Sequence, residues 1–534
     1  MTLPYPHADL SQSRDSRSDG KIFSILLALY FLILYPILRA NRYYNDDLKR
    51  ALIGHTGWDS NGRPLTTLLM KLLQCYDGAL VDISPFTQIA AIAVLAWIGV
   101  LIARRYAIRS PWMAALVAFP LGAQPFYLEN LSYKFDALSM SLAILLALLP
   151  VLVMNLQRRG WWLGVLSLFA SLSFYQPAIN VCLIFVLLDV VLAQLHGESV
   201  ASWLKTFSLR VLQVAAAMLF YQLIIGIHIH GWVEHEGEKI HSLSQLPLIA
   251  TNIAGFYRLI GNSFDRQWWT YFLPLLVVLG IFPMAIGVRY ATARRALHAS
   301  WISALLVLTS FVIPLMALLC IAGPMLLLLT PEYEPRVLMG VGALLVAALI
   351  VMHETLAQWQ RSPRWTLAAG CMLAVGMCSL ASAYGNALGE QKAYEDRIAA
   401  GLADDLADLK ATQGIRGFLL DGGIGFSPIT AHIAHDFPMV NKLVSPYISS
   451  QDRFHTTDFL LYYIAGIDDL GWKTDASSLR MRAVVLQSVC HVVVERARSA
   501  YALRVIDHVA VTSFYLAASQ DCRAASGSPQ PIRP

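Results

Sequence analysis

Short clusters of acidic, basic and aromatic residues are the part of this sequence that could do chemistry. Four of them stand out: NDDLKR at 45–50, ENLSYKFD at 129–136, FYQP at 174–177 and PEYEPR at 331–336. A carboxylate can remove a proton from a hydroxyl group, and an arginine or lysine can hold a phosphate or stabilise a departing anion. The elements around these clusters decide whether they share one face.

The aspartate pair Asp46 and Asp47 is the candidate for general-base chemistry. A helix cap is the ordinary role of such a pair, but this pair follows an apolar run and precedes an amphipathic segment. That segment begins at Pro64 and carries leucines at 65, 68, 69, 72 and 73, a spacing that predicts a helix lying on a membrane surface. We expect one aspartate to act as the base and the other to hold the acceptor or an ion, and the residues do not say which.

The other clusters supply candidate partners for a phosphate and a sugar. Charges at a membrane edge are costly and are often functional, although a structural salt bridge between Glu129 and Lys134 explains the second cluster equally well. The candidates for a lipid-linked phosphate are Arg336, Lys134, Arg50 and Arg63, and those for holding the acceptor or supporting the site are Glu129, Asp136, Tyr175, Gln176 and Glu334.

The rest of the chain has the composition of a membrane protein. Of its 534 residues, 57% are hydrophobic and only 14% are charged. Apolar runs cover 22–38, 86–103, 112–128, 137–156, 161–175, 178–195, 211–229, 271–288, 301–329, 337–352 and 365–384. They predict an all-α polytopic bundle of about eleven transmembrane helices. The basic residues are scattered among loops, which argues against a nucleic-acid partner.

The placement of lysine and arginine orients the bundle. When alternate loops are assigned to opposite sides, one side receives Arg104, Arg105, Arg109, Arg158, Arg159, Lys205, Arg210, Arg289, Arg294, Arg295, Arg361 and Arg364. That side must be cytoplasmic. The acidic clusters fall on the other side, with a local conflict in the first outer loop, where basic residues exceed those of the leader. The sequence therefore predicts a cytoplasmic N-terminus and an extracytoplasmic site.

Composition also predicts three parts of the chain. Residues 1–21 form a cytoplasmic leader, residues 22–384 a transmembrane catalytic domain with its first outer loop at 40–85, and residues 385–534 a soluble extracytoplasmic domain. Alternating patterns at 417–420, 483–494 and 504–515 predict strands there, and patterns at 428–435 and 456–464 predict helices, which together indicate a small α/β domain. Cys490 and Cys522 could pair in an oxidising compartment, and the last residues are expected to be disordered.

Metal binding has little support in the sequence. His228, His230, His235 and His241 lie in one outer loop with several glutamates, but their spacing fits no known closed site. A solvated loop is the better interpretation. No metal site is predicted, no cofactor is certain, and a divalent cation is left open.

Four stretches together resemble the serotype-converting O-antigen glucosyltransferases of the Gtr type II group. They are NDDLKR with GWDSNGRPLTTLL, PFYLENLSYKFDALSM, SFYQPAIN and EPRVLMG, in that order between residues 45 and 340. The resemblance implies a GT-C-like architecture in the bacterial inner membrane, with the C-terminal domain in the periplasm. It also implies transfer of glucose from a polyprenyl-phosphate-linked donor to O-antigen repeats of lipopolysaccharide at the periplasmic face. The chain lacks a separate DxD motif, which leaves its metal dependence open.

The expected reaction follows from this resemblance and from the topology. Asp46 or Asp47 would deprotonate an acceptor hydroxyl as it attacks the anomeric carbon, with inversion, while Arg336, Lys134 or Arg50 would stabilise the departing lipid phosphate. The partners would be a polyprenyl-phosphate–glucose donor, a lipid-linked O-antigen acceptor and the lipid bilayer. The C-terminal domain is expected to cover the site and select the acceptor.

Two other functions use similar substrates. A transporter or flippase for a lipid-linked sugar usually has internal repeats and charges near the bilayer midplane, and the sequence shows neither. An O-antigen polymerase or ligase would share the compartment and the substrates, and the residues do not exclude it.

Overall fold

The structure is a computed structural model that describes residues 16–229, 237–294, 300–450, 453–464, 466–470 and 492–514. Its contacts divide the chain into two compact units. The first comprises Met1–Leu38, Gly54–Tyr384 and Asp436–Leu443, and the second comprises Arg39–Ile53, Gly385–His435 and Val444–Pro534. The segment that carries Asp46 and Asp47 thus belongs to the same unit as most of the C-terminal residues.

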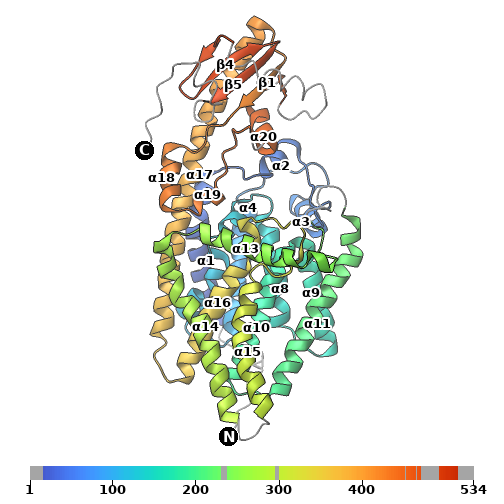
Figure 1. The fold of residues 1–534 in the computed structure, drawn as a ribbon, viewed down its shortest axis with the longest axis vertical. Helices are drawn as coiled ribbons and strands as arrows, with labels where there is room; N and C mark the ends of the chain where they lie inside the picture. Colours follow the sequence, from blue (N-terminus) through green and yellow to red (C-terminus); the bar gives the residue numbers. More distant parts are fainter. Residues whose placement is uncertain are drawn as a thin grey trace. The chain divides into compact units, whose positions relative to one another are not determined.

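Apolar helices, most of them long, build the first unit (Figure 1). They are α1 (Ser16–Ala40), α4 (Phe86–Arg105), α5 (Pro111–Ala118), α6 (Pro120–Ala123), α8 (Ala137–Leu152), α9 (Arg158–Phe174), α10 (Ile179–Leu195), α11 (Val200–Ile224), α14 (Arg266–Arg294), α15 (Ser300–Leu319), α16 (Gly340–Gln358) and the N-terminal part of α17 (Arg364–Gln413). Every predicted apolar run overlaps one or two of these helices, but the run at 301–329 is α-helical only in its first part, because α15 ends at Leu319 and the 3-10 helix η4 (Gly323–Leu327) follows.

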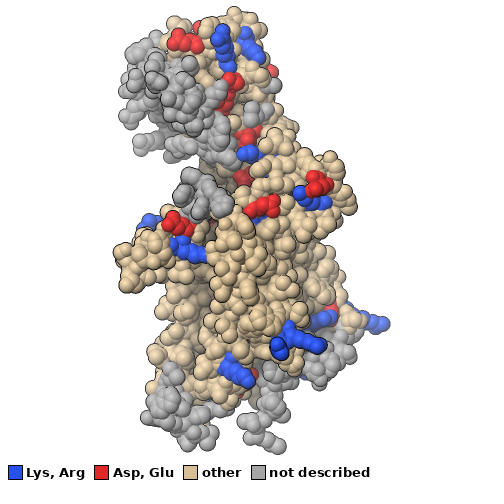
Figure 2. All heavy atoms as spheres, turned by 90° about the vertical axis from the view of Figure 1, so that its right-hand side faces the viewer, with Lys and Arg blue, Asp and Glu red and all other residues tan. Residues whose placement is uncertain are grey.

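Six segments among the described residues are long and apolar enough to cross a membrane: Ser16–Ala40, Phe86–Arg105, Gln176–Leu195, Val200–His228, Gly340–Gln358 and Arg364–Gln413. On the face shown in Figure 2, the body of the first unit presents a broad uncharged surface, with lysine and arginine gathered toward its edges. These observations support the membrane class. The count of eleven spans and the GT-C architecture stay predictions.

Two short helices of the first unit have a different character from the bundle. α3 (Pro64–Gln74) confirms the helix predicted from the leucine spacing, and it exposes Leu68 and Leu72 while burying Thr66, Thr67 and Met70. Leucines that face outward suit a membrane surface, as the pattern predicted. α13 (Pro247–Asn262) lies across the long helices in Figure 1. It was not predicted, because its apolar residues cover only one face and form no continuous run.

The second unit contains a five-stranded sheet with the order β2-β1-β5-β4-β3. The strands are β1 (Gly417–Asp421), β2 (Asp468–Asp469), β3 (Arg496–Ala497), β4 (Tyr501–Ile506) and β5 (Val509–Phe514). β1 pairs in parallel with β5 and β2, and the other pairs are antiparallel. The helices of this unit are α2 (Asp47–Ile53), α18 (Pro428–Asp436), α20 (Arg453–Tyr463) and the C-terminal part of α17.

The sheet confirms one predicted strand and corrects another. The pattern at 417–420 forms β1, whereas the pattern at 504–515 is not one strand: its described residues, 504–514, comprise the end of β4, a turn and β5. The turn falls at Asp507 and His508, whose φ angles of 48° and 61° are those of a tight hairpin connection. The predicted helices at 428–435 and 456–464 correspond to α18 and α20. Leu402 and Leu406 of α17 pack with Phe418 and Phe514 of the sheet in one core.

Some predictions concern residues that the structure does not describe. The proposed pairing of Cys490 with Cys522, most of the strand predicted at 483–494, and the predicted disorder at the C-terminus lie outside the described residues. So do His230 and His235 of the histidine-containing loop and the first fifteen residues of the leader.

The predicted orientation can be tested at Cys75, an exposed free cysteine at the C-terminal end of α3. A membrane-impermeant maleimide is expected to modify Cys75 in intact spheroplasts, because the first loop is predicted to face the periplasm. Peptide mapping by mass spectrometry identifies the modified site. In Cys75→Ser protein carrying Ser362→Cys, in a loop predicted to be cytoplasmic, modification at 362 is expected only after the membrane is permeabilised. The reverse pattern would overturn the orientation.

Candidate functional site

A buried ion pair between Glu129 and Arg336 forms the centre of a polar cluster in the first unit. The Glu129 side chain is 1% exposed and the Arg336 side chain 21% exposed. Glu129 Oε1 lies 3.4 Å from Arg336 Nη1, and Glu129 Oε2 accepts a hydrogen bond of 2.7 Å from the backbone N–H of Arg336. The Glu129 carboxylate therefore contacts both the guanidinium and the backbone of Arg336, although 207 residues separate the two in the sequence.

Other groups complete this cluster around the Arg336 guanidinium. Arg336 Nη1 donates to the Tyr133 hydroxyl at 2.6 Å, and Nη2 donates to the exposed carboxylate of Glu332 at 2.9 Å. The backbone carbonyl of Arg336 accepts hydrogen bonds from the Asn130 amide at 3.2 Å and the Tyr175 hydroxyl at 3.3 Å. We call Glu129, Tyr133, Tyr175, Glu332 and Arg336 the Arg336 cluster. Its arginine is held at several points, which limits its rotamers before any ligand binds.

A second arginine, Arg63, approaches the same cluster from the first loop. Its guanidinium carbon lies 4.6 Å from the centre of the Tyr175 ring, a distance typical of a cation–π contact. Its Nε donates to Gln176 Oε1 at 3.2 Å, and the Gln176 amide donates in turn to the Asn61 carbonyl at 2.9 Å and the Tyr221 hydroxyl at 2.8 Å. Tyr175 thus contacts both Arg63 and the backbone of Arg336, so two of the predicted phosphate ligands share one tyrosine.

The surrounding elements explain how these residues reach their positions. Glu129 and Asn130 lie on α7 (Tyr127–Ser132), a buried short helix between α6 and α8, and Arg336 lies on the 3-10 helix η5 (Pro335–Val337) before α16. α13 supports the loop before Arg336, because its Asn252 accepts a hydrogen bond of 3.0 Å from the Tyr333 hydroxyl. The rings of Phe256 and Tyr333 lie 4.9 Å apart. Helix α13 therefore supports the site, although none of the sequence motifs lies on this helix.

Burial sets the charges of the central pair. It raises the pKa of Glu129 to about 7, with Arg336 opposing and Glu334 adding to the effect of burial. Burial alone would lower the pKa of Arg336, but Tyr133 and the neighbouring carboxylates hold it well above its ordinary value. Because the folded chain keeps the Glu129 proton to a higher pH than the unfolded chain, this group's contribution to stability falls as the pH rises from 4.5 to about 7.

Lys134 and Asp136 lie close by in the chain but contact other partners. Lys134 is buried, with its Nζ 3.3 Å from Asp82 Oδ2. Asp136 is also buried and accepts a hydrogen bond of 2.6 Å from the Trp58 indole. Both contacts connect the first loop to the segment between α7 and α8, which indicates a structural role for Lys134 and Asp136. Glu129 pairs with Arg336 rather than with Lys134, so the salt bridge suggested by sequence proximity is wrong.

The aspartate pair lies in the second unit and its two members differ in environment. The Asp46 side chain is 46% exposed and lies 3.6 Å from Arg50 Nη1, one helical turn away. Asp47 is fully buried at the start of α2. Arg50 is buried as well, and its guanidinium lies beside the Asp46 carboxylate and is shielded from solvent. Of the two carboxylates, only that of Asp46 is open to a ligand in this arrangement.

Helix α20 adds two titratable residues that the sequence motifs did not single out. His455 Nε2 lies 4.0 Å from Asp46 Oδ1. Burial raises the pKa of the Asp458 carboxyl, Asp46 raises it further, and Lys49 and His455 oppose the rise. We call Asp46, Lys49, Arg50, His455 and Asp458 the Asp46 cluster. No local signal could have found His455 and Asp458, because they follow the motif by some 400 residues.

A buried network holds the turn that presents Asp46. Glu395 of α17 pairs with Arg42 at 2.9 Å and accepts a hydrogen bond of 2.8 Å from the backbone N–H of Tyr447. The Tyr447 hydroxyl accepts from the backbone N–H of Asn45 at 2.8 Å, and the Arg42 guanidinium lies 4.1 Å from the Tyr447 ring centre. Asn45 has a φ of 45°, a left-handed conformation that asparagine tolerates better than most residues.

The structure therefore brings the predicted residues together in two groups. Arg336, Glu129, Tyr175, Arg63 and Gln176 are linked in the first unit with Glu334 nearby, while Asp46, Asp47 and Arg50 lie together in the second. The first group offers guanidinium groups suited to a phosphate, and the second offers an accessible carboxylate suited to proton transfer. Within the described ranges, no group of three or more His, Cys, Asp or Glu side chains is arranged to hold a metal ion.

Comparisons with known proteins concern most of the chain. The profile of the glucosyl transferase GtrII family matches residues 35–347, which include the Asp46 motif and every residue of the Arg336 cluster. A Salmonella phage P22 protein, named as an uncharacterized 55.3 kDa protein in the gtrB 5′ region, is 24% identical over 487 residues, which cover 88% of this chain and 98% of the phage protein. No solved structure matches the chain.

The stability of the first unit is expected to depend on Glu129. Glu129→Ala leaves the buried side of Arg336 without its carboxylate, so we expect a loss of about 3–5 kcal/mol and a clearly lower Tm of the purified protein in detergent. Glu129→Gln keeps an acceptor for the Arg336 backbone and should cost less. The matched control is Glu332→Ala, which removes the exposed partner of the same arginine and should cost about 0–1 kcal/mol. Equal effects at 129 and 332 would contradict the central role of the buried pair.

Proposed function

The chain belongs to the glucosyl transferase GtrII family, and from this premise we propose that it is a membrane glycosyltransferase that moves glucose from a polyprenyl-phosphate donor to O-antigen repeats at the periplasmic face, with inversion at the anomeric carbon. The observation that carries the proposal is the Arg336 cluster. It places a restrained, partly exposed guanidinium, with Arg63 beside it, at one end of a bundle of apolar helices. A lipid-linked phosphate needs both features.

In this proposal Arg336 and Arg63 bind the donor phosphate. The leaving group is the lipid phosphate, and the negative charge that develops on it is stabilised by guanidinium groups that are already positioned. Arginine suits this task because its planar donors match two phosphate oxygens. Lys134, which is buried against Asp82, is given a supporting role in place of the direct contact expected from the sequence.

Asp46 is the proposed general base. Its carboxylate is accessible, so it can receive the proton of the acceptor hydroxyl as that oxygen attacks the anomeric carbon. Arg50 and His455 orient the carboxylate from two sides. Asp47 is fully buried and is assigned to holding α2 and the turn at Asn45. The difference in exposure thus favours Asp46 over Asp47 as the base, a choice that the sequence alone left open.

The protonation state of Glu129 is proposed to control donor binding. Above a pH of about 7 its carboxylate is charged and competes with the donor phosphate for Arg336. Below that pH the carboxyl is neutral, and the positive charge of Arg336 is available to the donor. The donor is a phosphodiester whose single charge does not change in this range, so any pH effect on its binding comes from the protein.

The first test is sugar transfer in vesicles from synthetic polyprenyl-phosphate–glucose to a lipid-linked O-antigen acceptor. Asp46→Asn is expected to lower kcat by about 10²–10⁴-fold, the usual contribution of a general base, without lowering the Tm. Asp47→Asn is expected to lower the Tm as well as activity. Asp77→Asn, an exposed aspartate of the same loop, serves as the matched control and should transfer glucose normally.

The outcomes separate the alternatives. Full activity of Asp46→Asn would remove the base assignment. Failure of the wild-type protein to transfer glucose, together with movement of the intact donor across the vesicle membrane, would favour a transporter instead.

The pH dependence of donor binding gives an independent test. The dissociation constant of the donor should rise by up to roughly tenfold between pH 6 and pH 8 in the wild type, as Glu129 loses its proton near pH 7. In Glu129→Gln the group is neutral at both pH values, so binding should stay tight and nearly independent of pH. Equilibrium binding of a fluorescent donor analogue measures both. A wild-type curve that is flat, or that slopes the other way, would refute the control by Glu129.

A further inference from the structure

A second polar pocket lies at the opposite end of the first unit's long helices. It is lined by residues of α10, by the N-terminal half of α11, by Glu198 between these two helices and by Arg105 at the end of α4. The other ends of α10 and α11 lie near Gln176 and Tyr221, which contact each other beside Arg63. The pocket is therefore separate from the candidate site and is not needed for the proposed chemistry.

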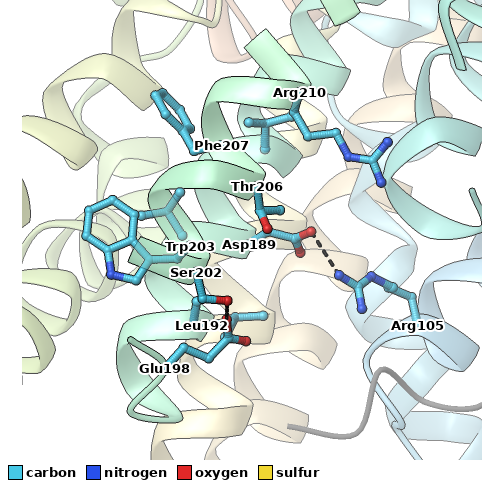
Figure 3. A pocket seen from close by; sticks show the side chains of 12 residues that line it. Arg105, Asp189, Leu192, Glu198, Ser202, Trp203, Thr206, Phe207 and Arg210 are labelled. Atoms are coloured by element: carbon cyan, nitrogen blue, oxygen red, sulfur yellow. Dashed lines mark hydrogen bonds and ion pairs between the residues drawn. The ribbon is translucent and has the colours of Figure 1, made fainter. Parts of the chain in front are cut away.

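The carboxylates of this pocket already have donors. Asp189 accepts from Arg105 at 2.9 Å and from the Tyr106 hydroxyl at 3.1 Å. Glu198 accepts from the Ser202 hydroxyl at 3.3 Å. Figure 3 shows the Arg105 and Arg210 guanidinium groups on the same side of the pocket, with the Asp189 carboxylate facing Arg105. The second arginine, Arg210, is hydrogen-bonded to neutral acceptors and not to either of these carboxylates.

Arg210 is a buried cation whose hydrogen bonds all go to neutral groups, although the Asp189 carboxylate attracts its charge. The residue is 8% exposed, and its two terminal nitrogens donate to Gln213 Oε1 at 3.0 Å and to the Met154 carbonyl at 2.8 Å. In the described part of the chain its Nε has no hydrogen-bond acceptor and its charge has no ion-pair partner. Because Asp189 forms its ion pair with Arg105, the buried charge of Arg210 is only partly compensated, which is costly. An anionic ligand in the pocket would remove that cost.

We propose that this pocket binds the phosphate of an anionic phospholipid headgroup. Its volume of about 70 Å³ is several times the roughly 10–15 Å³ needed to admit one water molecule, so a phosphate group has room. Arginine is the preferred partner of such a group. A lipid is favoured over a free ion because α11, which lines the pocket, also exposes the large apolar side chains of Leu204 and Leu212, and such side chains suit acyl chains.

The test is native mass spectrometry of the full-length protein in detergent, titrated with phosphatidylglycerol. We expect wild type to bind this lipid with an affinity at least about tenfold higher than that of Arg210→Gln, since one charge-assisted hydrogen bond is worth about that factor. Phosphatidylcholine should bind no better to the wild type than to Arg210→Gln. The matched control is Arg159→Gln, an exposed arginine at the start of α9, which should bind phosphatidylglycerol as the wild type does.

A second variant guards against misfolding of Arg210→Gln. Thr206→Leu fills the pocket while keeping Arg210, and it should weaken phosphatidylglycerol binding to a similar degree. Retained binding in both variants would overturn the proposal. Competition by millimolar inorganic phosphate with equal efficiency on a molar basis would also overturn it, because it would identify a free-anion site instead of a lipid site. Glucose transfer is not the readout, so the result does not depend on the proposed function.

Discussion

The buried pair of Glu129 and Arg336 is the interaction on which the first unit's site depends. A carboxylate that is almost fully buried is costly unless its charge is matched, and here the match also restrains an arginine that is partly exposed. Tyr133, Tyr175 and Asn130 are then arranged around that arginine, and α13 supports the loop before it. The same arrangement that offsets part of the cost of burial thus produces a preorganised guanidinium, the feature on which the proposed phosphate binding rests.

In the second unit, the backbone exposes one aspartate, Asp46, and buries its neighbour, Asp47. The backbone turns at Asn45, which has a left-handed conformation. The network of Arg42, Glu395 of α17 and Tyr447 stabilises that turn. Helix α20 then brings His455 next to Asp46. The proposed role of Asp46 as a general base needs a defined orientation and an accessible carboxylate, and these contacts are consistent with both.

Hydropathy and periodicity predicted the membrane class, the apolar helices and the strand at β1, because those signals are local. The leucine spacing after Pro64 likewise predicted α3 correctly. Pairings across long separations could not be read in the same way: proximity suggested Glu129 with Lys134, whereas each pairs elsewhere. Sequence motifs were therefore enough to select the candidate residues. The exposure of Asp46, the burial of Asp47 and the contacts with α20 depend on tertiary packing, which the motifs do not encode.

The hydrogen bond between Asn45 and Tyr447 joins residues that are 402 positions apart. During synthesis, the aspartate motif leaves the ribosome among the first segments of the chain, yet the tyrosine that fixes its turn is made near the end. A nascent chain can therefore insert its apolar helices long before the Asp46 cluster takes shape. The final arrangement of the Asp46 cluster thus waits for the synthesis of Tyr447 and of helix α20, so chains that end before these residues would carry the motif without the contacts that position Asp46.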